Sequence, residues 1–186
     1  YWDRDYKGIY LVNLFLKDRR GINSRLLIKN YENRLLTRRL QGEAYALRAW
    51  FYWDLLQKFG GKGTDGVLYG VPLLTEPSDV TADNNLSRAT YDECVAQIIE
   101  DCDSAWAYLP LAHRDQLTAA TDLGYLGGRN WGRFDGISTK AIKALVYLTW
   151  ASPRFNPGDE VARWDSAAVN AKAVIDYKHN YDFTAA

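Results

Sequence analysis

Apolar residues recur every three or four positions along much of the chain, and glycine- and proline-rich stretches separate these regions. Side chains three and four residues apart share one face of an α-helix, so this spacing indicates amphipathic helices. Neither half of the chain is rich in strand signals, although residues 67–69 and 72–74 are expected to be extended. The predicted helices cover residues 5–17, about 23–59, 91–109, 139–151 and 162–177.

The second predicted helix changes character along its length. Residues 25–41 are strongly charged, which is typical of a solvated helix face. From Gly42 onward the helix is apolar on nearly every side, and a helix that is apolar all round must be buried all round. Trp50 and Trp53 are therefore expected in the core. The aromatic residues of this part are Tyr45, Trp50, Phe51, Tyr52, Trp53 and Phe59.

The helix over residues 91–109 has the clearest local signals. Thr90 is a good N-cap, and Glu93 three residues later completes a capping box. Apolar residues then repeat at steps of three and four, and Pro110 ends the helix. The acidic residues are predicted to face solvent: Asp92, Glu93, Glu100, Asp101 and Asp103.

The last two predicted helices form a helical hairpin with small residues at their crossing. Ser138 is the expected cap of the first helix. Tetratricopeptide pairs use small residues and a terminal proline in this way. The sequence therefore predicts an all-α, TPR-like helical-repeat packing of amphipathic helix pairs with long irregular loops, as one domain over residues 1–186. The residues predicted to face inward are Ala141, Ala144, Leu145, Leu148, Ala151, Trp164, Ala167, Ala168, Ala171, Val174 and Ile175.

Composition narrows the classes of partner. The chain has 23 basic and 23 acidic residues and a formal net charge of zero, so nucleic-acid binding is disfavoured. Cys94 and Cys102 lie on one predicted helix about 12 Å apart along its axis, which is too far for a disulfide. Both are expected to be core thiols. No stretch is long and apolar enough to span a membrane.

Signals for catalysis are sparse. The two histidines, His113 and His179, have no partner at ligand spacing and are expected to be solvated. The sequence lacks a metal-binding Cys/His pattern, a phosphate loop, a dinucleotide fingerprint and a nucleophile elbow. We therefore expect no cofactor, no metal and no enzyme activity. The hypothesis that two loop carboxylates form the catalytic pair of a glycosidase stays open. Asp is, however, common in loops because of its turn chemistry.

Two glycine-rich loops carry side chains suited to a sugar. Sugar rings have apolar C–H faces that stack on aromatic rings, and their hydroxyls pair with Asp, Asn and Arg. Trp131 is a candidate platform, and the alternative is that it packs the loop down onto the helices. The candidate ligand-binding residues are Trp131, Tyr125, Asn130, Arg133, Asp65 and Tyr69.

Several segments resemble, in order, those of the SusD/RagB family. They are Glu43-Ala44 with Leu47-Arg48-Ala49, Phe59-Gly60-Gly61, Gly70-Val71-Pro72, the segment from Leu86-Ser87-Arg88 to Leu109-Pro110, and residues 136–157 and 164–176. Family members are helical nutrient-binding lipoproteins of Bacteroidetes outer membranes. The resemblance implies capture of a glycan (starch or another polysaccharide) or a peptide at the cell surface. It also implies delivery to a SusC-type TonB-dependent transporter.

The chain departs from the family in length and in its start. Family members are several hundred residues long and carry an N-terminal lipid-bearing cysteine, which this chain does not show. We therefore expect a fragment or processed part, with a membrane link only through a lipid anchor not visible here. Two other hypotheses stay open. One is a helical-repeat protein-interaction module without sugar binding, and the other is a glycan hydrolase.

Overall fold

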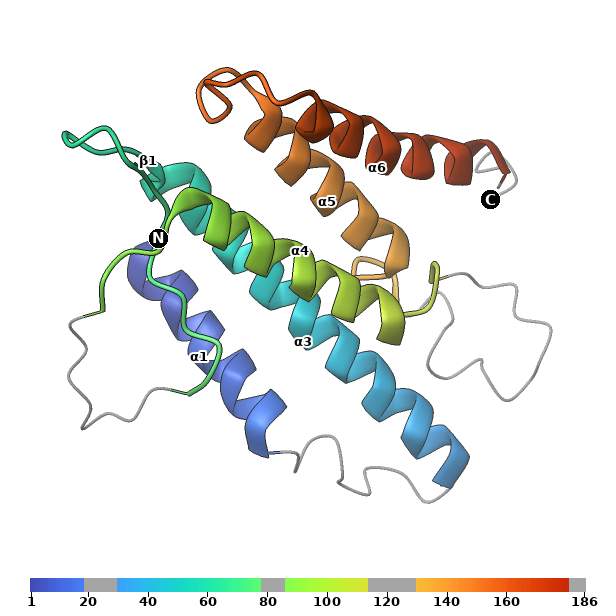
Figure 1. Cartoon of the computed structure of the whole chain (residues 1–186). Coiled ribbons are helices and arrows are strands. Elements are labelled where there is room, and N and C mark those ends of the chain that lie inside the picture. The colour runs from blue at the N-terminus through green and yellow to red at the C-terminus, as the bar shows by residue number, and fades with distance from the viewer. Residues whose placement is uncertain (19–29, 78–85, 114–129, 181–186) are drawn as a thin grey trace.

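The computed structural model describes residues 1–18, 30–77, 86–113 and 130–180. These residues form helices joined by irregular segments and one short antiparallel hairpin, which confirms the predicted all-α class (Figure 1). The elements are α1 (Trp2–Asp18), α3 (Asn30–Phe59), β1 (Gly61–Lys62), β2 (Leu68–Tyr69), α4 (Tyr91–Tyr108), α5 (Gly136–Ala151) and α6 (Val161–Asn180).

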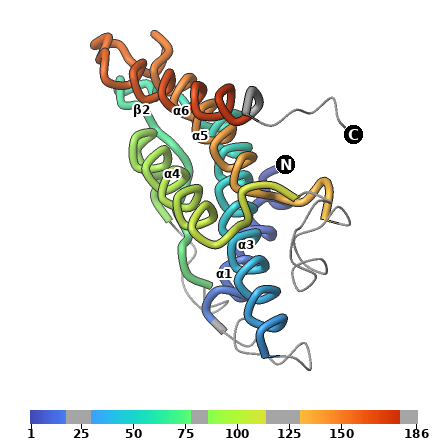
Figure 2. The backbone as a smooth tube through the Cα atoms, turned by 90° about the vertical axis from the view of Figure 1, so that its right-hand side faces the viewer, coloured from blue at the N-terminus to red at the C-terminus, as the bar shows by residue number. Residues whose placement is uncertain are grey.

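Each helix packs against the next one along the chain: α1 with α3, α3 with α4, α4 with α5 and α5 with α6. Consecutive helices run in opposite directions, and Figure 2 shows α5 and α6 stacked beyond the α3–α4 pair. This is the helical-repeat packing that the sequence predicted. The described part of α3 begins at Asn30, and the predicted start near residue 23 lies outside the described residues.

The core lies between α1, α3 and α4. Tyr52 and Leu55 of α3 are fully buried beside Ile9 and Ile98. The Tyr52 hydroxyl donates to the Leu74 carbonyl oxygen at 2.8 Å and accepts from the Leu74 amide at 2.6 Å. Burial raises the pKa of the Tyr52 phenol. This residue therefore anchors the segment after the hairpin to the C-terminal third of α3.

The apolar helix is not buried on every side. Trp53 is 3% exposed as predicted, but Trp50 is 43% exposed, so its placement in the core was wrong. The helices α1 and α4 cover only part of the circumference of α3 in the described residues. An apolar sequence indicates which faces favour burial, whereas the neighbouring helices decide which faces are covered.

The capping box of α4 is present as predicted. The Glu93 amide donates to the Thr90 hydroxyl at 3.2 Å, and the Thr90 amide donates to the Glu93 carboxylate at 2.7 Å. Cys94 and Cys102 are buried and unpaired, which confirms their assignment as core thiols.

Asp101 departs from the predicted solvent-facing set, because it is 1% exposed. Arg48 of α3 pairs with it through two parallel hydrogen bonds of 2.9 Å from Nε and 2.6 Å from Nη2. The same guanidinium donates to Asn13 Oδ1 of α1 at 2.8 Å. A buried ion pair therefore joins three helices, and the period of α4 alone gave no sign of its distant partner.

The boundaries and faces of the last two helices also differ from expectation. α5 begins at Gly136 with Asp135 as its N-cap, and Ser138 is the third helical residue of a capping box rather than the cap. α5 is apolar around much of its surface, so spacing alone did not select the stripe that meets α3 and α4. Ala151 and Ala167 are buried as predicted, whereas five residues predicted inward are exposed: Leu145, Leu148, Trp164, Ala168 and Ile175.

Candidate functional site

The turn before α5 carries three of the predicted ligand-binding side chains. The Arg133 amide donates to the Asn130 carbonyl oxygen at 3.1 Å and closes the turn. Gly132 has φ +83°, a left-handed conformation that glycine adopts at low cost. Trp131 is 66% exposed at the tip of this turn. The indole therefore presents a large apolar face to solvent and does not pack down onto the helices.

Two buried residues of α3 hold this turn in place. Arg133 Nε donates to Glu43 Oε1 at 2.8 Å, and Nη2 donates to Glu43 Oε2. Asn130 accepts a hydrogen bond from Arg39 through Oδ1 and is 6% exposed. The hydrogen bond to Glu43 raises the pKa of the Arg133 guanidinium. Asn130 and Arg133 thus act as anchors of the turn, while Trp131 projects between them.

Sequence reasoning missed the two anchoring residues on α3. Arg39 was expected on a solvated charged face, but Arg39 and Glu43 are each 7% exposed. They are four residues apart on one helix, and Arg39 Nε lies 3.6 Å from Glu43 Oε1. That i, i+4 spacing was the available signal. Their other partners lie about ninety residues later in the chain, which local patterns do not reveal.

The far side of the turn is fixed to the end of α4. The Gly136 amide donates to the Pro110 carbonyl oxygen at 2.8 Å, and the Ile137 amide donates to the Leu111 carbonyl oxygen at 3.1 Å. His113 is 7% exposed, and its Nε2 lies 3.1 Å from the Phe134 carbonyl oxygen. The prediction of a solvated His113 was therefore wrong, because the ring packs beneath this turn. The side chain of His179 lies outside the described residues.

The second predicted pair, Asp65 and Tyr69, lies on the β1–β2 hairpin. The Tyr69 hydroxyl donates to Asp65 Oδ2 at 2.7 Å, and the Val67 amide donates to Asp65 Oδ1 at 3.1 Å. These hydrogen bonds, with Tyr69 as the larger cause, lower the pKa of Asp65. The Asp65 carboxylate therefore bonds within its own hairpin. The Arg88 guanidinium lies over the Tyr69 ring, 5.7 Å from the centroid of that ring.

The two groups of candidates lie far apart along α3. The turn is anchored at Arg39, and the hairpin follows Phe59, so the two points are twenty helical residues or about 30 Å apart. Asn130, Trp131 and Arg133 therefore share one location, and Asp65 and Tyr69 share another. Tyr125 lies outside the described residues.

The chemistry offered by the Trp131 turn is recognition of an apolar face beside polar groups.

Within the described residues, no group of three or more His, Cys, Asp or Glu side chains is placed to hold a metal ion. None of the described helices combines the length and apolar character needed to cross a membrane.

A family model described as SusD-like, starch-binding and associating with the outer membrane matches residues 1–123. A solved SusD-like protein from Bacteroides fragilis is 24% identical with a TM-score of 0.67, and the match covers 98% of this chain and 27% of that one. A SusD homologue from Bacteroides thetaiotaomicron is 24% identical with a TM-score of 0.70, and the match covers 95% of this chain and 29% of that one. No curated protein sequence matches the chain.

A solved structure titled a laminarin-binding SusD-like protein is 23% identical with a TM-score of 0.63, and the match covers 94% of this chain and 29% of that one. The chain therefore spans between 27% and 29% of the length of these three solved structures. At these identities, the structural matches establish the helical fold.

Proposed function

Because the chain belongs to the SusD-like family, we propose that it is a glycan-binding module that does not catalyse a reaction on its ligand. The family model describes starch-binding proteins that associate with the outer membrane, and one solved structure with this fold is titled laminarin-binding. Starch and laminarin are both glucans, so neutral glucans are the first ligands to test.

The observation that carries this proposal is the exposure of Trp131 on an anchored turn. An indole that is 66% exposed offers an apolar platform for the C–H face of a sugar ring. The Arg133–Glu43 pair and the Asn130–Arg39 hydrogen bond hold its base before a ligand arrives. A platform fixed in advance loses little conformational freedom on binding, which favours affinity. Asp65 and Tyr69 form a second polar and aromatic group that a longer glycan would reach separately.

The proposed setting is the outer membrane of a Bacteroidetes cell, with the protein lipid-anchored and facing outward. The proposed partner is a SusC-type TonB-dependent transporter, on which the module acts as a lid and to which it passes its glycan. Exposed apolar residues on the outer helices, Leu145 and Leu148 of α5 and Val169 of α6, favour a protein contact there. If serine substitutions at all three left transporter association unchanged while loop changes abolished it, this placement would be wrong.

Isothermal calorimetry with maltooligosaccharides and laminari-oligosaccharides tests the glycan proposal directly. Trp131→Ala is expected to weaken binding about tenfold or more, equivalent to about 1.4 kcal/mol, and Trp131→Phe to retain most of it. Trp50→Ala is the matched control, because Trp50 is also an exposed indole, at 43%, but lies on the α3 helix. Chromatography of the recovered glycan should show no shorter products.

The outcomes separate the hypotheses. If Trp131→Ala and the unaltered chain bind the glycan with equal affinity, Trp131 is not part of the binding site. Shortened glycan, lost on changing one loop carboxylate, would establish a hydrolase instead. A stable transporter complex with no glycan binding at all would favour a protein-interaction module.

A further inference from the structure

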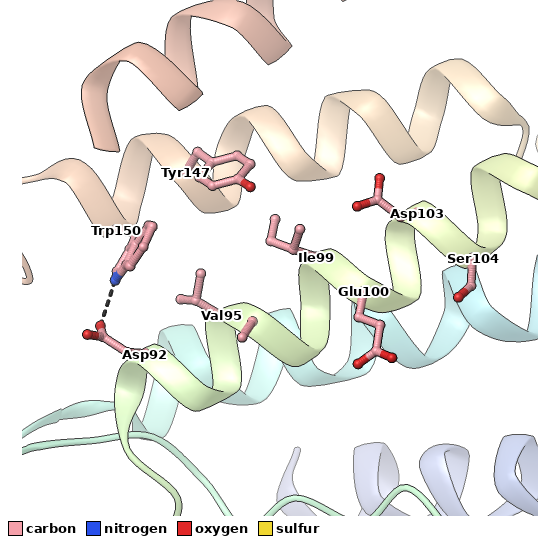
Figure 3. A pocket seen from close by; sticks show the side chains of 9 residues that line it. Asp92, Val95, Ile99, Glu100, Asp103, Ser104, Tyr147 and Trp150 are labelled. Atoms are coloured by element: carbon pink, nitrogen blue, oxygen red, sulfur yellow. Dashed lines mark hydrogen bonds between the residues drawn. The ribbon is translucent and has the colours of Figure 1, made fainter. Parts of the chain in front are cut away.

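A groove of about 720 Å³ lies between α4 and α5 and shares no residue with the Trp131 turn or the hairpin. Its volume falls within the range typical of small-molecule sites, about 300–1,000 Å³. Figure 3 shows its lining along α4 from Asp92 to Ser104, a span of twelve residues or about 18 Å. An elongated groove of this length suits a chain of several linked rings better than a single compact ligand.

One wall of the groove is aromatic and its floor is apolar. Tyr147 and Trp150 project from α5 toward Val95 and Ile99 of α4 (Figure 3). Trp150 Nε1 donates to Asp92 Oδ1 at 2.7 Å, and the Arg163 guanidinium of α6 lies 4.1 Å from the centroid of the Trp150 ring. These contacts from two other helices fix the indole. The aromatic side wall of the groove therefore includes an indole that is held in place before any ligand binds.

The charges around the groove nearly cancel. Lys143 Nζ donates to Asp103 Oδ1 at 2.6 Å, and Arg163 Nη2 lies 3.4 Å from Asp92 Oδ2. Among the described residues, no hydrogen bond or ion pair engages the third carboxylate, Glu100. The lining is thus left with about one net negative charge. A carboxylate has about four lone-pair sites, so even the paired ones can accept further hydrogen bonds.

We propose that the α4–α5 groove is a second glycan site that takes uncharged oligosaccharides and disfavours uronic-acid or sulfated ones, a refinement that rests on the glycan-binding function proposed above. Neutral sugar hydroxyls donate to the carboxylates of Asp92, Glu100 and Asp103, while ring faces contact Tyr147. An anionic sugar would bring like charge against Glu100, which is unfavourable. A strongly basic peptide fits less well, because Lys143 and Arg163 already neutralise two of the three carboxylates.

The test fills the groove without removing any of its contacts. Ala96 is an exposed residue of α4 that lines the groove, so Ala96→Trp blocks the space while leaving the core intact. Ala107→Trp is the matched control, because Ala107 is exposed on the same helix and lies outside the lining. Calorimetry measures the number of sites and their affinities for neutral glucan oligosaccharides, uronic-acid oligosaccharides and a lysine-rich peptide. Circular dichroism confirms that both variants keep their helix content.

In the unaltered chain and in Ala107→Trp we expect two binding events for neutral oligosaccharides. Ala96→Trp should weaken one of them about tenfold or more, and Trp131→Ala should weaken the other to a similar extent. Uronic-acid oligosaccharides should not occupy the site that Ala96→Trp blocks. Glu100→Ala provides a second variant at an exposed position, expected to weaken the same event.

The inference is overturned if Ala96→Trp and Ala107→Trp bind neutral oligosaccharides alike, or if the groove takes the lysine-rich peptide in preference to the glycans. If Trp131→Ala weakens binding and Ala96→Trp has no effect, the groove is not a glycan site, but the proposed glycan-binding function stands. If Ala96→Trp weakens binding and Trp131→Ala has no effect, the groove is a glycan site and Trp131 is not a platform. Absence of binding to every glycan removes both.

Discussion

Replacing Arg48 by methionine removes the cation at the centre of the buried network between α1, α3 and α4. Arg48 and Asp101 are 6% and 1% exposed, and the guanidinium also donates to Asn13 Oδ1 and to the Thr75 carbonyl oxygen, at 2.8 Å and 3.2 Å. In the variant, the Asp101 carboxylate stays buried without its counter-ion. Such a group has lost its hydration and has no compensating charge, so the folded state is disfavoured.

The expected cost of Arg48→Met at pH 7 is about 3–5 kcal/mol, the range for breaking a buried ion pair by removing one partner. This is a large part of the total stability of a typical domain, about 5–15 kcal/mol. Replacing both charged residues, as Arg48→Met with Asp101→Met, should cost less, because apolar pairs often replace buried ion pairs at little cost. Lys172→Met is the control, since Lys172 pairs with Asp176 at 2.7 Å on the exposed face of α6. Its expected cost is about 0–1 kcal/mol.

The cost should also depend on pH. Burial raises the pKa of Asp101, and the hydrogen bonds from Arg48 oppose this shift. Without Arg48 the folded-state pKa rises further above the unfolded value of about 3.9. The folded variant then binds a proton that the unfolded chain releases, so its stability falls as pH rises from about 4 toward the folded-state pKa. The stability gap between the unaltered chain and Arg48→Met should therefore widen from pH 4 to 7.

Urea unfolding followed by circular dichroism at several pH values measures these quantities. The reasoning is refuted if Arg48→Met costs no more than Lys172→Met at pH 7, or if its cost shrinks as pH rises. If Arg48→Met does not fold at pH 7, its recovery at pH 4 and the stability of the double variant still decide the question.

Two further expectations concern the packing around α4. Gly70→Ala should destabilise by about 1–3 kcal/mol, because an added Cβ would lie 2.8 Å from the Thr90 carbonyl oxygen and also meet Cys94. Gly158→Ala, with nothing within 4 Å of an added Cβ, should cost much less in the same urea unfolding assay, and equal costs would contradict the described packing. Burial raises the pKa of Cys94, and that of Cys102 to about 12, so both thiols should resist alkylation by iodoacetamide at pH 8 until the chain unfolds. Rapid labelling of the folded chain, followed by mass spectrometry, would contradict this.

Local signals predicted the elements of this fold well. The Thr90 capping box, the period of α4 and the end of the helix before Pro110 depend on residues within one or two turns of each other, and all three are confirmed. The same reasoning failed for Asp101, because its partner Arg48 lies 53 residues away. Spacing along α4 shows only that a polar residue adjoins the apolar stripe. Whether it faces solvent depends on a counter-ion from another helix.

The candidate site shows the same division. Aromatic and polar residues in a glycine-rich loop indicated a surface suited to sugars, which stays a prediction, and Trp131 in that loop is exposed. The roles of its neighbours could not be predicted, because Asn130 and Arg133 are engaged by Arg39 and Glu43 from the early part of α3. The α4–α5 groove was not foreseen at all, since its lining joins residues about fifty positions apart.

The sequence by itself determined that the chain forms a succession of helices, where most of them end, and which family it resembles. Those properties follow from side-chain periodicity, capping and motif order, which act over a few residues. The tertiary structure alone decided which polar groups are buried, which aromatic residues stay exposed and where a groove opens. Burial is a property of helix pairs, because the face of one helix is covered only where another helix meets it.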